Sequence, residues 1–239
     1  MATRTHESVS YWLRDGTEVF LGHASTLDER SVRGPSLLGG WTRAHVLAHM
    51  ARNAEALLRL ADWARTGVET PMYADPAQRA REIDTTAGHG LDRLLSELFA
   101  TSTTLEERLA VLSEEQWRHQ VRTAQGRLVP ATEIPWLRVR EVWLHTVDLG
   151  TGFHVADLPG DVVDALLDDV TAAFGTRDGV PPLTLTATDR PAVRTIPADG
   201  GEPTAVTGPA AALLGWLTGR SANGVTAEAP ALPELPRWL

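Results

Sequence analysis

Apolar residues recur every three or four positions through the N-terminal part of the chain, the spacing of helices that bury one face. End signals support the helix bounds, with Thr42 and Asp75 as N-caps and Gly67 and Gly150 just beyond helix ends. The segment 123–135 carries glycine and proline and is predicted to be a loop whose last residues overlap the start of the next helix. The pattern predicts helices over residues 5–23, 43–66, 76–86, 91–112 and 132–149.

Beyond Gly150 the pattern changes to one that mixes helices and strands. Segments rich in threonine and valine alternate with turn residues, as short strands do. We expect helices over 158–175 and 208–220, strands within 181–190, 192–198 and 204–208, and an extended surface tail over 230–239. The chain is therefore predicted to be α+β, with a helical bundle in residues 1–152 and a small α/β domain in residues 153–239.

Composition and charge narrow the classes of function. The chain has 239 residues, 43% of them hydrophobic and 22% charged, which is typical of a globular protein with a sizeable core. The net charge is −9 and there is no basic run, which argues against nucleic acid or an anionic membrane as the main partner. No segment approaches the ~18 apolar residues of a membrane span, and the N-terminus lacks the apolar core of a signal peptide. We therefore expect a cytoplasmic protein.

The absence of cysteine restricts the chemistry further. It excludes disulfides, thiolate metal ligands and a cysteine nucleophile. Any metal must be held by histidine, carboxylate or backbone groups. Any thiol chemistry must use a thiol that another molecule brings.

The helix predicted over 132–149 carries a polar stripe. Glu141 and His145 lie four residues apart, and Arg138 and Asp148 fall within about 80° of them around the helix. From spacing alone, the preferred interpretation is a solvated face tied by ion pairs. The alternative is that Glu141 and His145 bind a metal ion.

Two histidines on the helix over 43–66 bear on this choice. His45 lies nearly opposite the centre of the apolar face, which suits a solvent-facing or capping histidine, whereas His49 lies nearer its edge. His49, Glu141 and His145 would make a set of three ligands that suits Zn²⁺ and leaves a coordination position open. The same set also suits iron or nickel, and the sequence does not establish that the two helices are neighbours.

Four other residues are candidates for a binding site. Tyr73 lies in a loop before a helix, where it could line a pocket or simply pack. Gln125 and Arg127 flank a glycine in the predicted loop. Arg220 ends an apolar helix, where it could complement the helix dipole or hold a substrate carboxylate.

Six segments stand out along the chain: "LLGGWTRAHVLAHMARNAEAL", "TGVETPMY", "TAQGRLVPATE", "REVWLHTVDLG", "TGRSANGVT" and "PELPRWL". Together, and in this order, they resemble the mycothiol-dependent maleylpyruvate isomerase family. The resemblance implies a DinB-like metal-binding four-helix bundle followed by a small α/β domain. It implies zinc ligands at His49, Glu141 and His145, and an important arginine at Arg220. It also implies mycothiol as a thiol cosubstrate, which agrees with a chain that has no cysteine.

The chemistry implied by this resemblance is a cis–trans isomerisation in gentisate-type aromatic degradation. A thiolate adds to the cis double bond of maleylpyruvate, the resulting single bond rotates, and the thiol leaves to give fumarylpyruvate. Zinc would favour the thiolate, and Arg220 would clamp a carboxylate or enolate. Tyr73, Gln125 and Arg127 are weaker candidates for orienting substrate or thiol. Asp148 is either a supporting partner of a ligand or a surface acid, and the same two interpretations are open for Arg138.

Two other functions stay open at this stage. The same bundle could serve a mycothiol S-transferase that conjugates the thiol to another electrophile, because both reactions need a zinc thiolate. It could also be a metal-binding or structural bundle without catalysis. The expected partners are a small-molecule substrate and a low-molecular-weight thiol, with no nucleic acid and no membrane. The sequence does not determine the oligomeric state, and a monomer is one of the possibilities.

Overall fold

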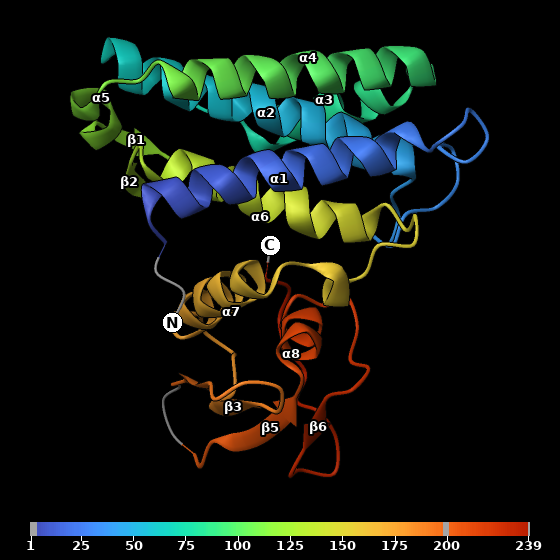
Figure 1. Cartoon of the computed structure of the whole chain (residues 1–239), viewed down its shortest axis with the longest axis vertical. Coiled ribbons are helices and arrows are strands. Elements are labelled where there is room, and N and C mark those ends of the chain that lie inside the picture. The colour runs from blue at the N-terminus through green and yellow to red at the C-terminus, as the bar shows by residue number, and fades with distance from the viewer. Residues whose placement is uncertain (1–3, 198–200, 239) are drawn as a thin grey trace. The chain divides into compact units, whose positions relative to one another are not determined.

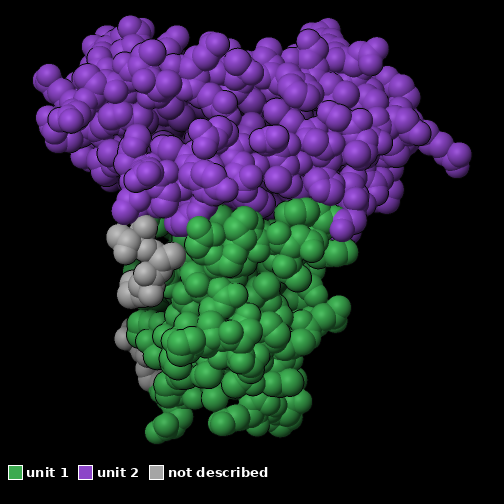
Figure 2. Space-filling model, viewed as in Figure 1, with its two compact units in different colours: residues 1–4, 153–239 green, residues 5–152 purple. Residues whose placement is uncertain are grey.

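The computed structural model describes residues 4–197 and 201–238, and the chain divides into two compact units (Figures 1 and 2). One unit comprises Thr5–Gly152, and the other comprises residues from Phe153 onward together with Arg4. Two ends of predicted segments, Ala198 of a strand and Leu239 of the tail, lie outside the described residues.

The first unit is a helical bundle, as predicted (Figure 1). Helix α2 packs against α3, α4 and α6, and α1 packs against α6 and α4, so four long helices share one core. Among the described residues, no helix is both long enough and apolar enough to cross a membrane. The helices are α1 (His6–Ser25), α2 (Arg43–Thr66), α3 (Pro76–Ala87), α4 (Leu91–Ala110), α5 (Glu114–Arg118) and α6 (Glu133–Asp148).

Helix α2 has the ends that the sequence predicts. The Thr42 side chain accepts a hydrogen bond from the His45 backbone N–H, and the His45 ring nitrogen Nδ1 lies 2.7 Å from Thr42 Oγ1. His45 is therefore a capping residue, which was one of the two interpretations open for it. Gly67 ends the helix at φ 74°, a left-handed conformation that glycine adopts at little cost.

The first part of the predicted loop and the three residues before it form a hairpin instead. Strand β1 (Gln120–Arg122) pairs antiparallel with β2 (Leu128–Pro130), and buried Val121 faces buried Val129. The strands have three residues each, too few to reveal a period of two. The five-residue helix α5 was missed for the same reason.

The second unit is a small mixed sheet with helices, which agrees with the predicted α/β region (Figure 1). The strand order is β4-β3-β5-β6, with β3 parallel to β5 and the two outer pairs antiparallel. Strand β6 is an addition to the prediction. The elements are the 3-10 helix Val155–Asp157, α7 (Gly160–Phe174), β3 (Leu183–Ala187), β4 (Val193–Ile196), β5 (Thr204–Gly208), α8 (Ala210–Leu217) and β6 (Thr226–Ala227).

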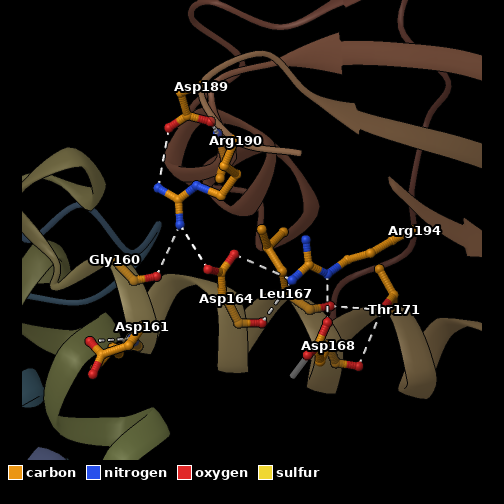
Figure 3. Close-up of polar contacts among 11 residues, drawn as sticks. Gly160, Asp161, Asp164, Leu167, Asp168, Thr171, Asp189, Arg190 and Arg194 are labelled. Carbon is orange, nitrogen blue, oxygen red and sulfur yellow. Dashed lines mark hydrogen bonds and ion pairs between the residues drawn. The ribbon is translucent and has the colours of Figure 1, made fainter. Parts of the chain in front are cut away.

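Ion pairs join α7 to the β3–β4 hairpin in this unit (Figure 3). Asp164 lies 3.0 Å from Arg190 and 3.3 Å from Arg194, and Asp168 lies 2.6 Å from Arg194. Arg190 also donates to the carbonyl of Gly160 at the start of the helix, at 3.0 Å. The side chains are mostly shielded from solvent, so this network holds the helix against the hairpin.

Candidate metal centre

The packing of α2 against α6 brings the three predicted metal ligands together. His49 extends from α2, and Glu141 and His145 extend from successive turns of α6. Their ligand atoms all lie within 4.8 Å of one another. The Nε2 atoms of His49 and His145 lie 2.9 and 3.1 Å from the same oxygen, Glu141 Oε2. The three side chains, called the ligand trio below, thus face a common point.

The polar stripe of α6 is not a solvated face. The side chains of Glu141 and His145 are only 16% and 14% exposed, and Arg138 and Asp148 are almost completely buried. The solvated face predicted from spacing is therefore wrong, because spacing places residues on one side of a helix but carries no information about what covers that side. In this fold α2 covers much of it.

Arg138 connects α6 to two other helices. Its guanidinium donates to the carbonyl of Met50 and to Asn53 Oδ1, both at 2.8 Å, and to Ser102 Oγ at 3.3 Å. Burial lowers the pKa of Arg138 to about 10, which leaves it charged at neutral pH. Because Met50 follows His49 directly, this buried guanidinium ties the two ligand-bearing helices together at the level of the trio.

Asp148 lies behind His145, a position that suits a supporting acid, one of the two interpretations left open by the sequence. Its Oδ2 is 2.8 Å from His145 Nδ1, and the aspartate side chain is fully buried. A carboxylate can only accept here, so His145 Nδ1 carries a proton and donates it. The contact orients the ring with Nε2 toward Glu141.

The three ligands differ in their affinity for protons. Burial lowers the pKa of His49 to about 4, so its imidazole is neutral at physiological pH. Burial would also lower the pKa of His145, but its hydrogen bonds to Asp148 and Glu141 outweigh burial and raise it. Burial opposes ionisation of Glu141, but hydrogen bonds from His145 and His49 hold its pKa well below the usual value. Without metal, the trio therefore contains one carboxylate, one neutral histidine and one histidine that protonates readily.

Two further side chains contact the trio, and the sequence analysis identified neither as a site residue. The Trp41 ring lies 5.5 Å from the His49 ring, centroid to centroid. Arg79, on α3, places Nη2 3.2 Å from His49 Nδ1. Trp41 directly precedes the N-cap of α2, a position that could have suggested proximity to the first turns of that helix. Arg79 lies in a short polar helix and gave no signal in the sequence.

The remaining predicted site residues of this unit separate into two groups. Tyr73 is half-buried, and the Arg79 guanidinium lies over its ring at 5.7 Å, so Tyr73 is one residue removed from His49. Gln125 and Arg127 are exposed at the turn of the β1–β2 hairpin. That hairpin adjoins the end of α2, roughly four helical turns or about 22 Å along the axis from His49. Roles for these three residues in binding stay predictions.

Arg220 lies three residues beyond the end of helix α8 in the second unit, whereas the sequence predicted that it ends the helix. Its backbone N–H donates to the carbonyl of Gly215 at 2.8 Å, and its Nη1 donates to the carbonyl of Thr218 at 3.0 Å. These bonds satisfy carbonyls at the end of the helix, the structural role considered for a terminal arginine. A role in holding substrate stays a prediction.

The donor set is one that a divalent transition metal can use. Two imidazole nitrogens and one carboxylate oxygen suit Zn²⁺, with a fourth position left for another ligand. Carboxylates and histidines also cluster in proteins that bind no metal, so the surroundings of the trio bear on this assignment. Here the trio is shielded from solvent, and Asp148 orients one of its histidines, as the partners of metal ligands do.

Two models of one protein family together match most of the chain. The family model described as the mycothiol maleylpyruvate isomerase N-terminal domain matches residues 13–150, and the model of the corresponding C-terminal domain matches residues 157–233. A solved structure described as mycothiol-dependent maleylpyruvate isomerase is 36% identical, with a TM-score of 0.93, over 98% of this chain and 97% of that one.

A second solved structure, of a histidine-to-alanine mutant described by the same name, is also 36% identical over 98% of this chain and 97% of that one, with a TM-score of 0.92. No curated protein sequence matches the chain. The two domain matches follow one another in the order of the two compact units, and the structural likeness extends over nearly the whole length. The chain therefore belongs to the mycothiol maleylpyruvate isomerase family.

Proposed function

We propose that this protein is a zinc- and mycothiol-dependent isomerase that converts maleylpyruvate to fumarylpyruvate. The observation that carries the proposal is the convergence of His49, Glu141 and His145 at one shielded point. It is supported by the likeness of the whole chain to a structure of that name, at 36% identity. The absence of cysteine adds that the reacting sulfur has to come from another molecule.

His49, Glu141 and His145 are the residues that would hold the metal. A zinc ion in that position would supply a Lewis acid that lowers the pKa of a thiol and so favours its thiolate near neutral pH. The chain contributes a ligand set with the required charge, since burial keeps His49 neutral and its neighbours keep Glu141 ionised. Asp148 holds the Nδ1 proton of His145, which leaves Nε2 as the nitrogen available to a ligand.

The isomerisation requires that a double bond become a single bond for a time. Addition of the mycothiol sulfur to one alkene carbon shifts the electron pair toward the conjugated carbonyl, giving an enolate. Rotation about the new single bond, followed by re-formation of the alkene and departure of the same sulfur, gives the trans isomer. The thiol is regenerated, so the reaction consumes no redox equivalent.

The side chains that face the substrate must then balance its negative charge. We assign to Arg220 the role of holding a carboxylate or the developing enolate, because its guanidinium can form two parallel hydrogen bonds to such a group. Tyr73, Gln125 and Arg127 are assigned weaker orienting roles toward substrate or thiol. Of these three, Tyr73 has the strongest structural support, through its contact with Arg79 beside His49.

The direct test is turnover by defined protein. Purified protein is stripped of metal, reloaded with zinc, and given maleylpyruvate with and without mycothiol while fumarylpyruvate is followed. We expect turnover only when zinc and thiol are both present, and loss of both zinc and turnover in His49→Ala. A folded, zinc-loaded protein that gives no fumarylpyruvate would rule out this substrate. A stable thiol adduct as product would indicate a mycothiol S-transferase instead.

A further inference from the structure

The contact between Arg79 and His49 is unusual for a prospective metal ligand. Arg79 Nη2 lies 3.2 Å from His49 Nδ1, while His49 Nε2 lies 2.9 Å from Glu141 Oε2. Among the residues that the structure describes, no carboxylate forms an ion pair with Arg79, whose guanidinium otherwise lies 5.7 Å over the ring of Tyr73. The positive charge of Arg79 is thus held against a histidine and an aromatic ring.

The hydrogen-bonding inventory of the two side chains determines the tautomer of His49. A guanidinium only donates, so Nδ1 must accept, and the proton of the neutral imidazole must be on Nε2. That proton is donated to Glu141, which agrees with the 2.9 Å distance. Ligation of a metal through Nε2 needs the opposite tautomer, with the lone pair on Nε2 and the proton on Nδ1.

The two arrangements exclude each other. Once His49 Nδ1 carries a proton, it would point an N–H group at the N–H groups of Arg79, and two donors cannot share a hydrogen bond. Arg79 must therefore leave His49 when His49 ligates a metal through Nε2. Its side chain is half-buried beside the trio and forms no ion pair with a described carboxylate, so a released guanidinium would lack a charged partner.

A free guanidinium in such a place needs an anion. A carboxylate matches its planar pair of donors, and the proposed substrate carries carboxylates on both sides of its double bond. We propose that Arg79 alternates between two partners: His49 in the metal-free protein, and a carboxylate of the bound substrate once the trio holds a metal. This inference rests on the proposed function and adds a substrate-binding residue to it.

The proposal makes two binding predictions of opposite sign for Arg79→Met, which keeps an apolar stem and removes the donors. Zinc should bind more tightly, by roughly three- to tenfold, because the competing hydrogen bond is gone. Maleate, a cis dicarboxylate used as the probe, should bind the zinc-loaded variant at least about tenfold more weakly. Chelator competition measures the first quantity, and titration calorimetry measures the second.

The matched control is Arg81→Met, an exposed arginine two residues away on the same helix. It removes the same charge from α3 and should change neither affinity. Arg79→Lys keeps a donor and a charge but not the bidentate geometry, so its maleate affinity should lie between those of the wild type and Arg79→Met. Equal effects at both arginines would overturn the proposal, because the positive charge of α3, and not the contact between Arg79 and His49, would then set the two affinities.

Three other outcomes would each contradict part of the Arg79 proposal. Weaker binding of both zinc and maleate by Arg79→Met would mean that Arg79 only supports the fold. Unchanged zinc affinity would refute the exchange of partners, and failure of the wild type to bind maleate would refute the carboxylate role. None of these readouts needs turnover. A zinc-loaded protein that shows the two opposite shifts but makes no fumarylpyruvate would contradict the proposed function and leave the Arg79 inference standing.

Discussion

At the scale of single residues, the state of His145 is set by its two acidic neighbours. Glu141 and Asp148 lie 3.1 and 2.8 Å from its two ring nitrogens, so the metal-free protein favours an imidazolium that donates to both. A metal ligand must give up the Nε2 proton. The aspartate that orients His145 therefore also increases the competition between protons and metal.

This dual role predicts the behaviour of Asp148→Asn. Loss of the carboxylate should lower zinc affinity by about ten- to hundredfold near pH 8, because an orienting and basicity-raising partner is lost. The pKa of His145 is raised in the wild type, so proton competition begins above the usual histidine value of 6.5 and strengthens as pH falls. In the variant, the fall of zinc affinity with decreasing pH should begin at a lower pH. Chelator competition over a pH series measures both effects.

The pH series has its own control in Asp92→Asn, an exposed acid on α4. That variant should reproduce the wild-type curve. The free energy of unfolding of the metal-free protein, measured over the same pH range, tests the direction of the His145 pKa shift. A raised pKa stabilises the folded protein below the unfolded-state value, and this contribution disappears as pH rises through the folded value. Asp148→Asn should therefore lose more stability at acid than at alkaline pH; the reverse order would contradict this assignment.

At the scale of elements, the approach of α1 to α6 depends on one glycine. A β-carbon built on Gly16 would lie 2.6 Å from Trp143 Nε1 and 2.7 Å from Val142 Cγ2. The Trp143 indole is buried and donates to the carbonyl of Trp12 at 3.0 Å, so it cannot move away without losing a hydrogen bond. The absence of a side chain at Gly16 is thus a condition for this helix contact.

Gly16→Ala should therefore destabilise the protein even though alanine favours helix. The propensity gain is about 1 kcal/mol, whereas overpacking a tight contact typically costs about 1–3 kcal/mol, and the added loss of the Trp143 hydrogen bond makes the net change unfavourable. Gly22→Ala in the same helix meets nothing within 4 Å and should stabilise by up to about 1 kcal/mol. Chemical denaturation compares the two; a stabilised Gly16→Ala would mean that the contact is looser than described.

The elements also show which parts of the fold can be predicted from sequence. Long helices can be recognised from the period of their apolar residues and from their capping residues. Helix α2 begins after Thr42 and ends before Gly67, as expected. The two strands of the hairpin, helix α5 and strand β6 each have between two and five residues, too few to show a period. Their existence depends on what they pack against.

The same limit applies to the site. His49, Glu141 and His145 could be selected by residue type and by resemblance, but spacing alone favoured a solvated stripe. The burial of that stripe depends on the packing of α2 against α6, which is not encoded in either helix by itself. Arg79 was missed because its contact with His49 joins residues 30 apart on different helices. Periodicity carries no information about such a pair.

At the scale of the whole molecule, the proposed chemistry draws on both compact units. The ligand trio belongs to the first unit, and Arg220 to the second. Each unit carries a match to one domain of the same family. If catalysis needs Arg220, a change confined to the second unit must impair turnover without disturbing the metal site in the first.

Arg220→Met tests this requirement. We expect kcat/KM to fall by about a hundredfold or more, the usual consequence of removing a group that stabilises developing charge. Zinc affinity should be unchanged, because no ligand is touched. The variant also loses the bond from Nη1 to Thr218, which should cost about 1 kcal/mol of stability at the end of α8. Arg220→Lys, which keeps the charge, should recover part of the activity.

A structural contrast separates a catalytic effect from a loosened second unit. Arg194→Met breaks the ion pairs of β4 with Asp164 and Asp168 on α7 (Figure 3) and should lower the midpoint of thermal unfolding with little change in kcat/KM. Thermal unfolding, zinc affinity and turnover are measured together for the three variants. If Arg194→Met and Arg220→Met lose activity in proportion to their loss of stability, Arg220 only supports its helix. A loss of activity in Arg220→Met that is much larger than its loss of stability explains would indicate that its guanidinium contacts the reacting molecule.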